Sequence, residues 1–254
     1  MTLRLEKNDK IAHLIIDRPD KRNAFTQEMW ELFPELLAEA MADDVVRVLT
    51  VNASKKDSAF CAGADIGEFG AGSTDPKWRA KNQAAIGKVQ HELAQAPKPT
   101  IAVIDGDCVG GGCGIALACD LRIAGPKARF GITPAKLGLV YPLHDTKLLV
   151  DAVGPSQAKR VLFTGQILSA EEALRIGLIT IFADEPYVEA MALADTMASV
   201  SSHSQRMSKA IIKRILDGQA DDDADSRALF DSAFESDDFK EGVSAFLDKR
   251  KPEF

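Results

Sequence analysis

The sequence predicts an α/β protein whose C-terminal part is entirely helical. Up to about residue 185, short apolar and β-branched runs alternate with segments of helical periodicity, as strands and helices do. Beyond that point only helical segments follow. The 254 residues, 46% hydrophobic and 27% charged, suffice for a sizeable buried core. We therefore expect a mixed core over residues 1–195 and a helical region over residues 196–254.

The N-terminal segments predict a hairpin, a helix and a strand. Leu3–Glu6 and Ile11–Ile16 are two strand-like runs separated by a short polar turn, which is the pattern of a β-hairpin. Thr26 is a suitable N-cap for the helix that follows, and Pro34 is expected to bend that helix. Val45–Val51 then predicts a strand.

A Gly-rich polar segment, Gly67–Pro76, interrupts the strand and helix alternation. Its composition predicts a mobile lid. In the next segment Ile86, Val89 and Leu93 are three and four residues apart, which places them on one face of a helix. Two prolines end this helix and lead into an apolar strand, Ile101–Ile104.

Three consecutive glycines follow the apolar strand Ile101–Ile104 and open a helix of small residues. A strand that turns through Gly110–Gly112 into a helix exposes free backbone N–H groups at the positive end of the helix dipole. That end favours negative charge, whether on a bound anion or developing during a reaction. Glycines also let a ligand approach the backbone closely. The alternative is a tight turn that binds no ligand.

The rest of the chain predicts two short strands and then helices. The expected elements are strands at Leu121–Ala124 and up to Gly131, helices from Gly154 to Phe163 and from Ser169, and helix from about Val188 onward, interrupted at 199–204 and 221–223. The acidic run 221–223 predicts a solvated loop or a helix start rather than a metal site.

Bulk properties exclude several classes of protein. A net charge of −7 argues against a general nucleic-acid binder. No apolar run reaches the roughly 18 residues of a membrane helix, and the N-terminus lacks the apolar region of a signal peptide. Four cysteines without metal-type spacing indicate a reducing compartment, so we expect a cytoplasmic protein without a metal. Cys61 is interpreted as a packing residue rather than a nucleophile.

The segment Ala59–Ile66 and the glycine turn together resemble two motifs of the crotonase (enoyl-CoA hydratase/isomerase) superfamily. Further segments resemble the family in the same order along the chain: Arg18–Ala24, Arg129–Gly131, Leu162–Gly165, Ala173–Ile179 and Glu241–Arg250. The resemblance implies a spiral of ββα turns with a helical C-terminal region that builds homotrimers, often paired into hexamers.

The resemblance also implies where an acyl-CoA substrate binds. The backbone N–H groups of Ala64 and Gly111 would form an oxyanion hole for the thioester carbonyl, where fixed donors stabilise an enolate. No separate cofactor is implied, since coenzyme A is part of the substrate. Contacts to coenzyme A carry over to Arg22, Ala24, Ala62, Asp65 and Ile66 and, from a neighbouring subunit, to Phe246 and Lys249.

Two positions depart from the hydratases of this family. Gly114 and Pro134 stand where hydratases carry their two catalytic glutamates. Hydration needs one group that activates water and another that delivers a proton, and neither Gly nor Pro can do so. We therefore expect weak hydration and favour an isomerase or a decarboxylase. The alternative is a non-catalytic acyl-CoA-binding member of the family.

Three polar residues follow in the loop that lines the acyl pocket of family members, and they are candidate acid/base groups. The stretch from Thr133 to Tyr141 has a local resemblance to methylmalonyl-CoA decarboxylase, in which the Tyr lies in the active site. Histidine as a residue type can exchange protons near neutral pH, which makes His144 a candidate, and Asp145 could act as a base if burial raised its pKa. We rank Tyr141 first, His144 second and Asp145 third. The alternatives are a structural phenol and a solvent-facing pair at a helix start.

Overall fold

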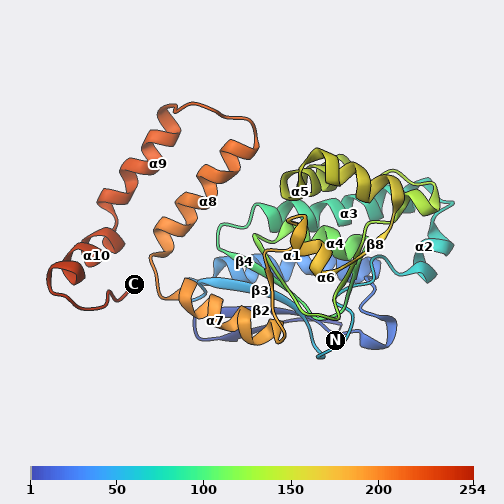
Figure 1. The fold of residues 1–254 in the computed structure, drawn as a ribbon, viewed down its shortest axis with the longest axis horizontal. Coiled ribbons are helices and arrows are strands. Elements are labelled where there is room, and N and C mark those ends of the chain that lie inside the picture. Colours follow the sequence, from blue (N-terminus) through green and yellow to red (C-terminus); the bar gives the residue numbers. More distant parts are fainter. Residues whose placement is uncertain (1) are drawn as a thin grey trace.

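The protein contains a six-stranded sheet and a smaller three-stranded sheet (Figure 1). A computed structural model describes residues 2–254. The main sheet runs in the order β1 (Leu3–Asn8), β2 (Ile11–Ile16), β3 (Val48–Ala53), β4 (Thr100–Ile104), β6 (Leu121–Ala124) and β9 (Ile181–Phe182). β1 pairs antiparallel with β2, and the other neighbours are parallel. The second sheet holds β5 (Asp107–Val109), β7 (Arg129–Gly131) and β8 (Ile167–Ser169).

Helices cover both faces of the main sheet. One core lies between the sheet and the helices α1 (Gln27–Ala42), α3 (Pro76–Ala94), α4 (Gly111–Ala118) and α5 (Leu143–Thr164). On the opposite face α7 (Pro186–Ala198) packs small alanine side chains against the strands. Because strand side chains alternate between the two faces, Leu14 of β2 joins the first core and Ile11 joins the second. All six residues of β2 are buried, as expected for a strand covered on both sides.

The predicted hairpin and the predicted helix starts are confirmed. β1 pairs with β2 from Leu3 opposite Ile16 to Asn8 opposite Ile11. Thr26 caps α1, since its hydroxyl accepts from the Met29 N–H at 3.3 Å. The helix runs without a break across Pro34. The short helix α6 (Ala170–Arg175) is capped in the same way by Ser169.

The structure changes two expectations about the N-terminal half. The segment 67–76 is largely helical, because α2 (Ile66–Gly72) occupies most of it and α3 begins at Pro76, and its role as a mobile lid stays a prediction. The physical reason is capping: Asp65 accepts from the Gly67 N–H at 2.8 Å, and Asp75 accepts from the Lys77 N–H at 2.9 Å. The third strand begins at Val48 rather than at Val45, after a turn in which the Val46 N–H donates to the Asp43 carbonyl.

The structure adds three short strands, and one helix differs in extent from the prediction. The added strands are β5, between the central strand β4 and the glycine turn, and β8 and β9. The helix predicted to start at Gly154 is the second part of α5, which already begins at Leu143. Gly154 marks a kink in α5, with φ of 73°, a backbone conformation that glycine adopts without strain. Two short 3₁₀ turns, Pro19–Lys21 and Pro134–Leu137, lie in the loops and have no buried residue.

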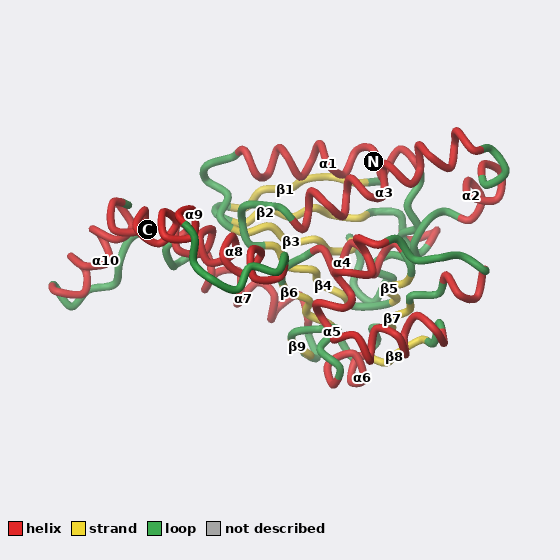
Figure 2. Tube along the Cα trace, turned by 90° about the horizontal axis from the view of Figure 1, so that it is seen from above, coloured by secondary structure: helices red, strands yellow, loops and turns green. Residues whose placement is uncertain are grey.

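The last three helices, α8 (Ser202–Leu216), α9 (Ala224–Glu235) and α10 (Asp237–Leu247), extend away from the sheets (Figures 1 and 2). The predicted interruptions are confirmed, and Asp223 of the acidic run caps α9. Lys209 of α8 binds Asp120 of the core at 2.7 Å. Residue 195 lies inside α7, which packs on the sheet, so the division of the chain at that residue stays a prediction.

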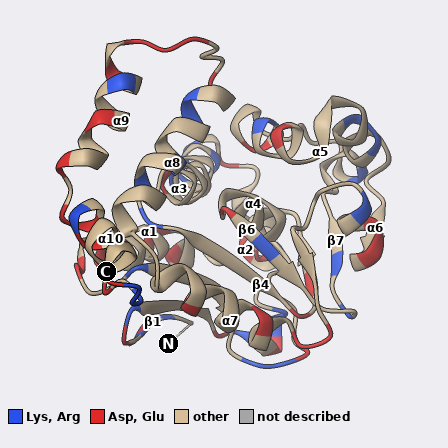
Figure 3. Ribbon diagram, turned by 60° about the vertical axis from the view of Figure 1, so that its left-hand side comes forward, with Lys and Arg blue, Asp and Glu red and all other residues tan. Residues whose placement is uncertain are grey.

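Charged residues of both signs are interspersed along the helices and loops (Figure 3). In residues 2–254 there is no helix whose length and apolar character would let it cross a bilayer.

Candidate active site

The segment 61–65 runs between α1 and β5, held on both sides by backbone hydrogen bonds. On one side, the Phe25 N–H donates to the Gly63 carbonyl and the Asp65 N–H donates to the Phe25 carbonyl, both at 2.8 Å. On the other side, the Cys61 N–H donates to the Asp107 carbonyl at 3.1 Å. These bonds fix the segment directly beside the strand that leads into the glycine turn.

The backbone N–H groups of Ala64 and Gly111 donate to no partner inside the described chain. Their neighbours are engaged: the Asp65 N–H donates to Phe25, and the Gly110 N–H donates to the Gly131 carbonyl at 2.7 Å. In residues 2–254, no hydrogen bond uses the N–H of Ala64 or Gly111. Gly111 is also the first residue of α4, where N–H groups have no helical partner. The two predicted oxyanion-hole donors are therefore both available to a ligand.

The segment 61–65 and the glycine turn approach each other closely, which explains why glycine occupies positions 63 and 111. A Cβ atom on Gly63 would stand 3.1 Å from the Val109 carbonyl oxygen and 3.4 Å from the Gly111 nitrogen, and Gly63 has φ of 95°. Beneath Gly111 lies the ring of Trp30, fully buried, 3.0 Å from where a Gly111 Cβ would stand. Side chains at these positions would push the donors apart.

A surface hollow of about 410 Å³ opens next to Ala64. Five of the residues that the resemblance assigns to coenzyme A line this hollow: Arg22, Ala24, Ala62, Asp65 and Ile66. Lys21, Gly67 and Val109 complete its wall. The structure thus brings together predicted residues that are up to 44 positions apart in the chain.

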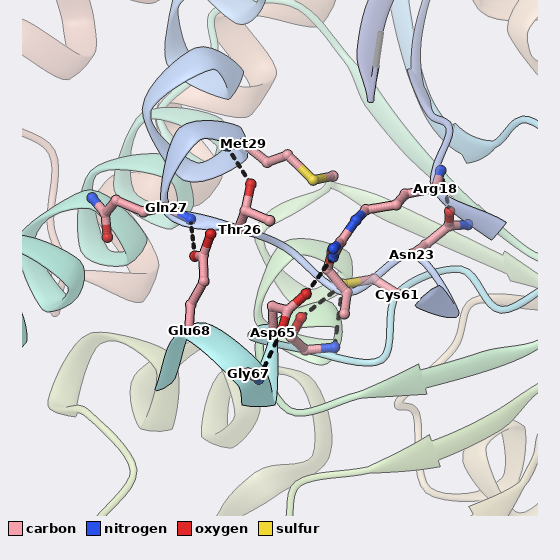
Figure 4. A network of polar contacts seen from close by, with 11 residues as sticks. Arg18, Asn23, Thr26, Gln27, Met29, Cys61, Asp65, Gly67 and Glu68 are labelled. Atoms are coloured by element: carbon pink, nitrogen blue, oxygen red, sulfur yellow. Dashed lines mark hydrogen bonds and ion pairs between the residues drawn. The ribbon is translucent and has the colours of Figure 1, made fainter. Parts of the chain in front are cut away.

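Within this hollow, Asp65 holds the backbone in place. Its carboxylate pairs with Arg18 at 2.6 Å and caps α2 (Figure 4). The hydrogen bond from Arg18 lowers the pKa of Asp65, so the carboxylate stays charged at neutral pH. The same Arg18 donates to the Ala24 carbonyl at 2.9 Å, which ties the first loop to the segment 61–65.

Positive charge gathers at the edge of the hollow. Asp107 accepts hydrogen bonds from both Arg22 and Arg129. Burial acts to raise the pKa of Asp107, but the bonds from Arg129 and Arg22 outweigh it and the pKa is lowered. Two guanidinium groups therefore share one carboxylate, which leaves a net positive charge suited to phosphate groups.

Phe246 and Lys249 lie far from this hollow within one chain. Both are at the end of α10, at the opposite end of the molecule from α2 in Figures 1 and 2. Phe246 is 83% exposed. The predicted contact of these two residues with coenzyme A thus needs a neighbouring subunit.

A buried carboxyl lies where α3, α4 and α5 meet. Asp145, in the first turn of α5, is 3% exposed. The side-chain nitrogen of Gln90 from α3 donates to both carboxylate oxygens of Asp145, with Oδ2 at 2.9 Å. The amide is assigned this orientation because the reverse would set two acceptors against each other. Burial raises the pKa of Asp145 to about 6, against a lowering by the Gln90 hydrogen bond.

Tyr141 and His144 lie beside this carboxyl. The Tyr141 hydroxyl and the His144 Nε2 are buried without a hydrogen-bond partner in the described chain. Burial first, and then the neighbouring Asp145, raise the pKa of Tyr141 well above its ordinary value. The centre of the His144 ring lies 5.6 Å from that of His91 in α3, with the two ring planes tilted by 57°. We call Asp145, Gln90, Tyr141 and His144 the carboxyl centre.

The carboxyl centre contacts α4, the helix that begins at Gly111 of the predicted oxyanion hole, through Gln90 and Gly114. Gly111 and Gly114 are three residues apart, which is roughly 4.5 Å along a helix axis. Gln90 fills the space that a side chain on Gly114 would take. The solvent-facing alternative for the pair at the helix start is wrong for Asp145, because the first turn of α5 directs it against α3.

Sequence reasoning missed Gln90 and Trp30. The signal for Gln90 was present, since it shares the helix face of Ile86, Val89 and Leu93, where a polar residue is out of place. The prediction for Cys61 is confirmed: the thiol is fully buried, and burial raises its pKa to about 12.

Comparisons with known proteins agree with this architecture. The enoyl-CoA hydratase/isomerase family model matches residues 6–254. The chain is 34% identical to a crotonyl-CoA hydratase of Syntrophomonas wolfei, covering 98% of this chain and 96% of the relative. It is 35% identical to a short-chain-enoyl-CoA hydratase of Clostridium acetobutylicum, covering 98% and 95%.

Solved structures of the same family match closely. A crystal structure of an enoyl-CoA hydratase/isomerase family protein from Hyphomonas neptunium superposes with a TM-score of 0.96 at 39% identity. The match covers 100% of this chain and 97% of that one. The predicted fold is confirmed, and the chain is an enzyme of the enoyl-CoA hydratase/isomerase family, the crotonase superfamily.

Proposed function

We propose that the protein is an enoyl-CoA isomerase that moves a double bond along an acyl chain bound as a coenzyme A thioester. The observation that carries this proposal is the buried carboxyl of Asp145, whose partner Gln90 lies against Gly114, about one helical turn along α4 from the free N–H of Gly111. Among residues 2–254, Asp145 is the one carboxylic acid that is fully buried. Among the candidate acid/base groups we therefore place Asp145 before Tyr141 and His144, which changes the ranking made from the sequence.

Isomerisation needs one base that can return the proton it takes. In the proposed reaction a 3-enoyl thioester loses a proton from C2 to the Asp145 carboxylate, and the electron pair moves onto the thioester oxygen. The N–H groups of Ala64 and Gly111 stabilise this dienolate. The Asp145 O–H bond then breaks as the proton is delivered to C4, which leaves the double bond between C2 and C3. A pKa of about 6 suits both steps.

Two other reactions fit the carboxyl centre less well. Hydration uses a second group to activate water, and the resemblance places Gly114 and Pro134 where hydratases carry glutamates. In decarboxylation the substrate carries its own carboxylate, which an ionised Asp145 would repel. The local resemblance to methylmalonyl-CoA decarboxylase stays a prediction.

The test is a panel of substrates: 3-hexenoyl-CoA, crotonyl-CoA and methylmalonyl-CoA, with products identified by mass spectrometry and by absorbance of the conjugated thioester. We expect turnover of 3-hexenoyl-CoA and little hydration of crotonyl-CoA. Crotonyl-CoA hydration above about 10 per second would contradict the proposal. Binding without turnover of any substrate would support a non-catalytic acyl-CoA-binding protein.

The pH dependence distinguishes the two roles that Asp145 can play. If Asp145 first acts as a base, kcat/KM for 3-hexenoyl-CoA falls about tenfold per pH unit below its pKa of about 6. If it acts first as an acid, as in protonating a product of decarboxylation, the rate instead falls above pH 6. We expect the first profile.

We further propose that the active form is a homotrimer or hexamer in the cytoplasm. The helices α9 and α10 expose large apolar side chains, with Phe230 64%, Phe246 83% and Leu247 72% exposed. Packing these side chains against another copy would remove them from water and could bring Phe246 and Lys249 to a neighbouring site. Analytical ultracentrifugation at micromolar concentration tests this, and a monomer would contradict it.

A further inference from the structure

We propose that Gln90 of α3 is the positioning residue of the active site, which fixes the Asp145 carboxyl by hydrogen bonding and occupies the space left by Gly114. This inference rests on the proposed role of Asp145, and it adds a residue outside the motifs that carry the family resemblance. Gln90 contacts Asp145 rather than the reacting atoms, so its effect reaches the substrate only through that carboxyl.

The geometry leaves Gln90 little freedom. The side chain is 1% exposed, and its neighbours Val89 and Leu93 are fully buried. Its nitrogen reaches both oxygens of Asp145, so the carboxylate cannot rotate about its terminal bond without losing one of them. A buried carboxyl with both oxygens held by one amide is kept in a single orientation, as transfer of a proton between two carbon atoms requires.

Gly114 leaves free the space that the Gln90 side chain occupies. A Cβ atom at position 114 would collide with the Gln90 amide. A long side chain from α4 and Gln90 from α3 therefore compete for one space, and in this chain the residue from α3 fills it. The polar side chain in this space is thus Gln90 of α3 rather than a residue of α4. The proposed base, Asp145, comes from α5.

Other polar groups lie near Asp145 on each packed element. They are Tyr141 and His144 on its own side of the site, His91 behind His144 on α3, and the thiols of Cys108 and Cys113 near Tyr141 on β5 and α4. Among the described residues, burial and the Gln90 hydrogen bond are the two influences on the Asp145 pKa. Removing the Gln90 donor should therefore change the titration of Asp145 more than removing any other neighbour.

The first experiment measures kcat for 3-hexenoyl-CoA from pH 5 to pH 9 in Gln90→Met, which keeps the length of the side chain and removes the donor. We expect the acidic limb to move to higher pH, so that kcat falls about tenfold at pH 6.5 and less than about threefold at pH 9. Gln83→Met is the matched control, because Gln83 lies exposed on the same helix. An equal loss at every pH would show a merely structural role and overturn the proposal.

The second experiment does not depend on any activity. In protein labelled with ¹³C at the Asp side-chain carboxyl, NMR follows the titration of Asp145, identified by its absence in Asp145→Asn. We expect the midpoint to rise in Gln90→Met and to stay unchanged in Gln83→Met. An unchanged midpoint in Gln90→Met would overturn the role of Gln90 even if Asp145 proved essential. A shifted midpoint in a protein whose Asp145→Asn variant keeps full activity would contradict the proposed function instead.

Gly114→Ala provides a second variant that keeps the Gln90 side chain. The added methyl group should push the amide away from Asp145 and move the NMR midpoint in the same direction. The combination with Gln90→Met should shift the midpoint no further than Gln90→Met alone, because both changes remove one interaction. If the midpoint shifts of the two single variants added up in the combination, Gly114 and Gln90 would act independently, which would contradict the proposal that they compete for one space.

Discussion

The predicted oxyanion hole and the carboxyl centre meet at one short helix, α4, but they are built from different parts of the chain. The hole is made of backbone N–H groups from two turns, at Ala64 and Gly111, and no side chain takes part in it. The carboxyl centre is made of side chains, with Asp145 from α5 held by Gln90 from α3. The difference teaches that backbone donors do not depend on the identity of any side chain, whereas the proposed reaction depends on Asp145 and the side chain that holds it.

The largest expected effect is in the carboxyl centre, from Asp145→Asn. The variant keeps the shape of the side chain and cannot accept a proton, so isomerase turnover should fall about 1000-fold. Steady-state kinetics at pH 8 measure it. Asp151→Asn, on the same helix, is the matched control and should stay within about twofold of the parent. Near-normal turnover in Asp145→Asn would assign the proton transfer to Tyr141 or His144.

The next effect tests the hole through Gly111→Pro, which removes one N–H donor at a position where a helix tolerates proline. Activity should fall between about 100- and 1000-fold. Gly111→Ala is the control, because it adds the same contact with Trp30 and keeps the donor. Equal losses in the two variants would attribute the effect to Trp30 rather than to the missing donor.

A third effect concerns stability. Burial raises the pKa of Asp145 from 3.8 to about 6, so the folded state binds its proton more tightly than the unfolded state does. The ionised carboxylate therefore costs stability that grows between pH 4 and pH 6 and stays constant above. The free energy of unfolding of Asp145→Asn, relative to the parent, should rise by up to about 3 kcal/mol from pH 4 to pH 7. Urea denaturation at both pH values measures it, and a parallel pH dependence of the two proteins would contradict it.

The smallest effect is expected at the ion pair behind the hole. Asp65→Asn retains a capping side chain for α2 and weakens the pair with Arg18, which is 21% exposed. Unfolding free energy should fall by about 1 kcal/mol, with turnover within about threefold, because Asp65 supports Ala64 without touching the reacting atoms. Asp20→Asn, at an exposed position, serves as the control. A large loss of turnover with unchanged stability would place Asp65 in the chemistry.

Much of the hole could be predicted from local sequence. The run of glycines dictates a strand-to-helix turn with free N–H groups, because only glycine permits the close approach of Gly63 to Gly111. The alternation of strands and helices was likewise visible, since periodicity reports which residues are buried. The helical structure of the segment 67–76 was missed because its glycines concealed two caps, Asp65 and Asp75.

The sequence by itself determined the fold class through its periodicity, and its resemblance to the family implied the two backbone donors and the residues of the hollow. Only the tertiary structure decided that Asp145 is buried and that Gln90 holds it. The physical reason is that burial and its effect on a pKa depend on helices that are 55 residues apart in the chain. No local pattern around Asp145 specifies which side chain α3 presents to it.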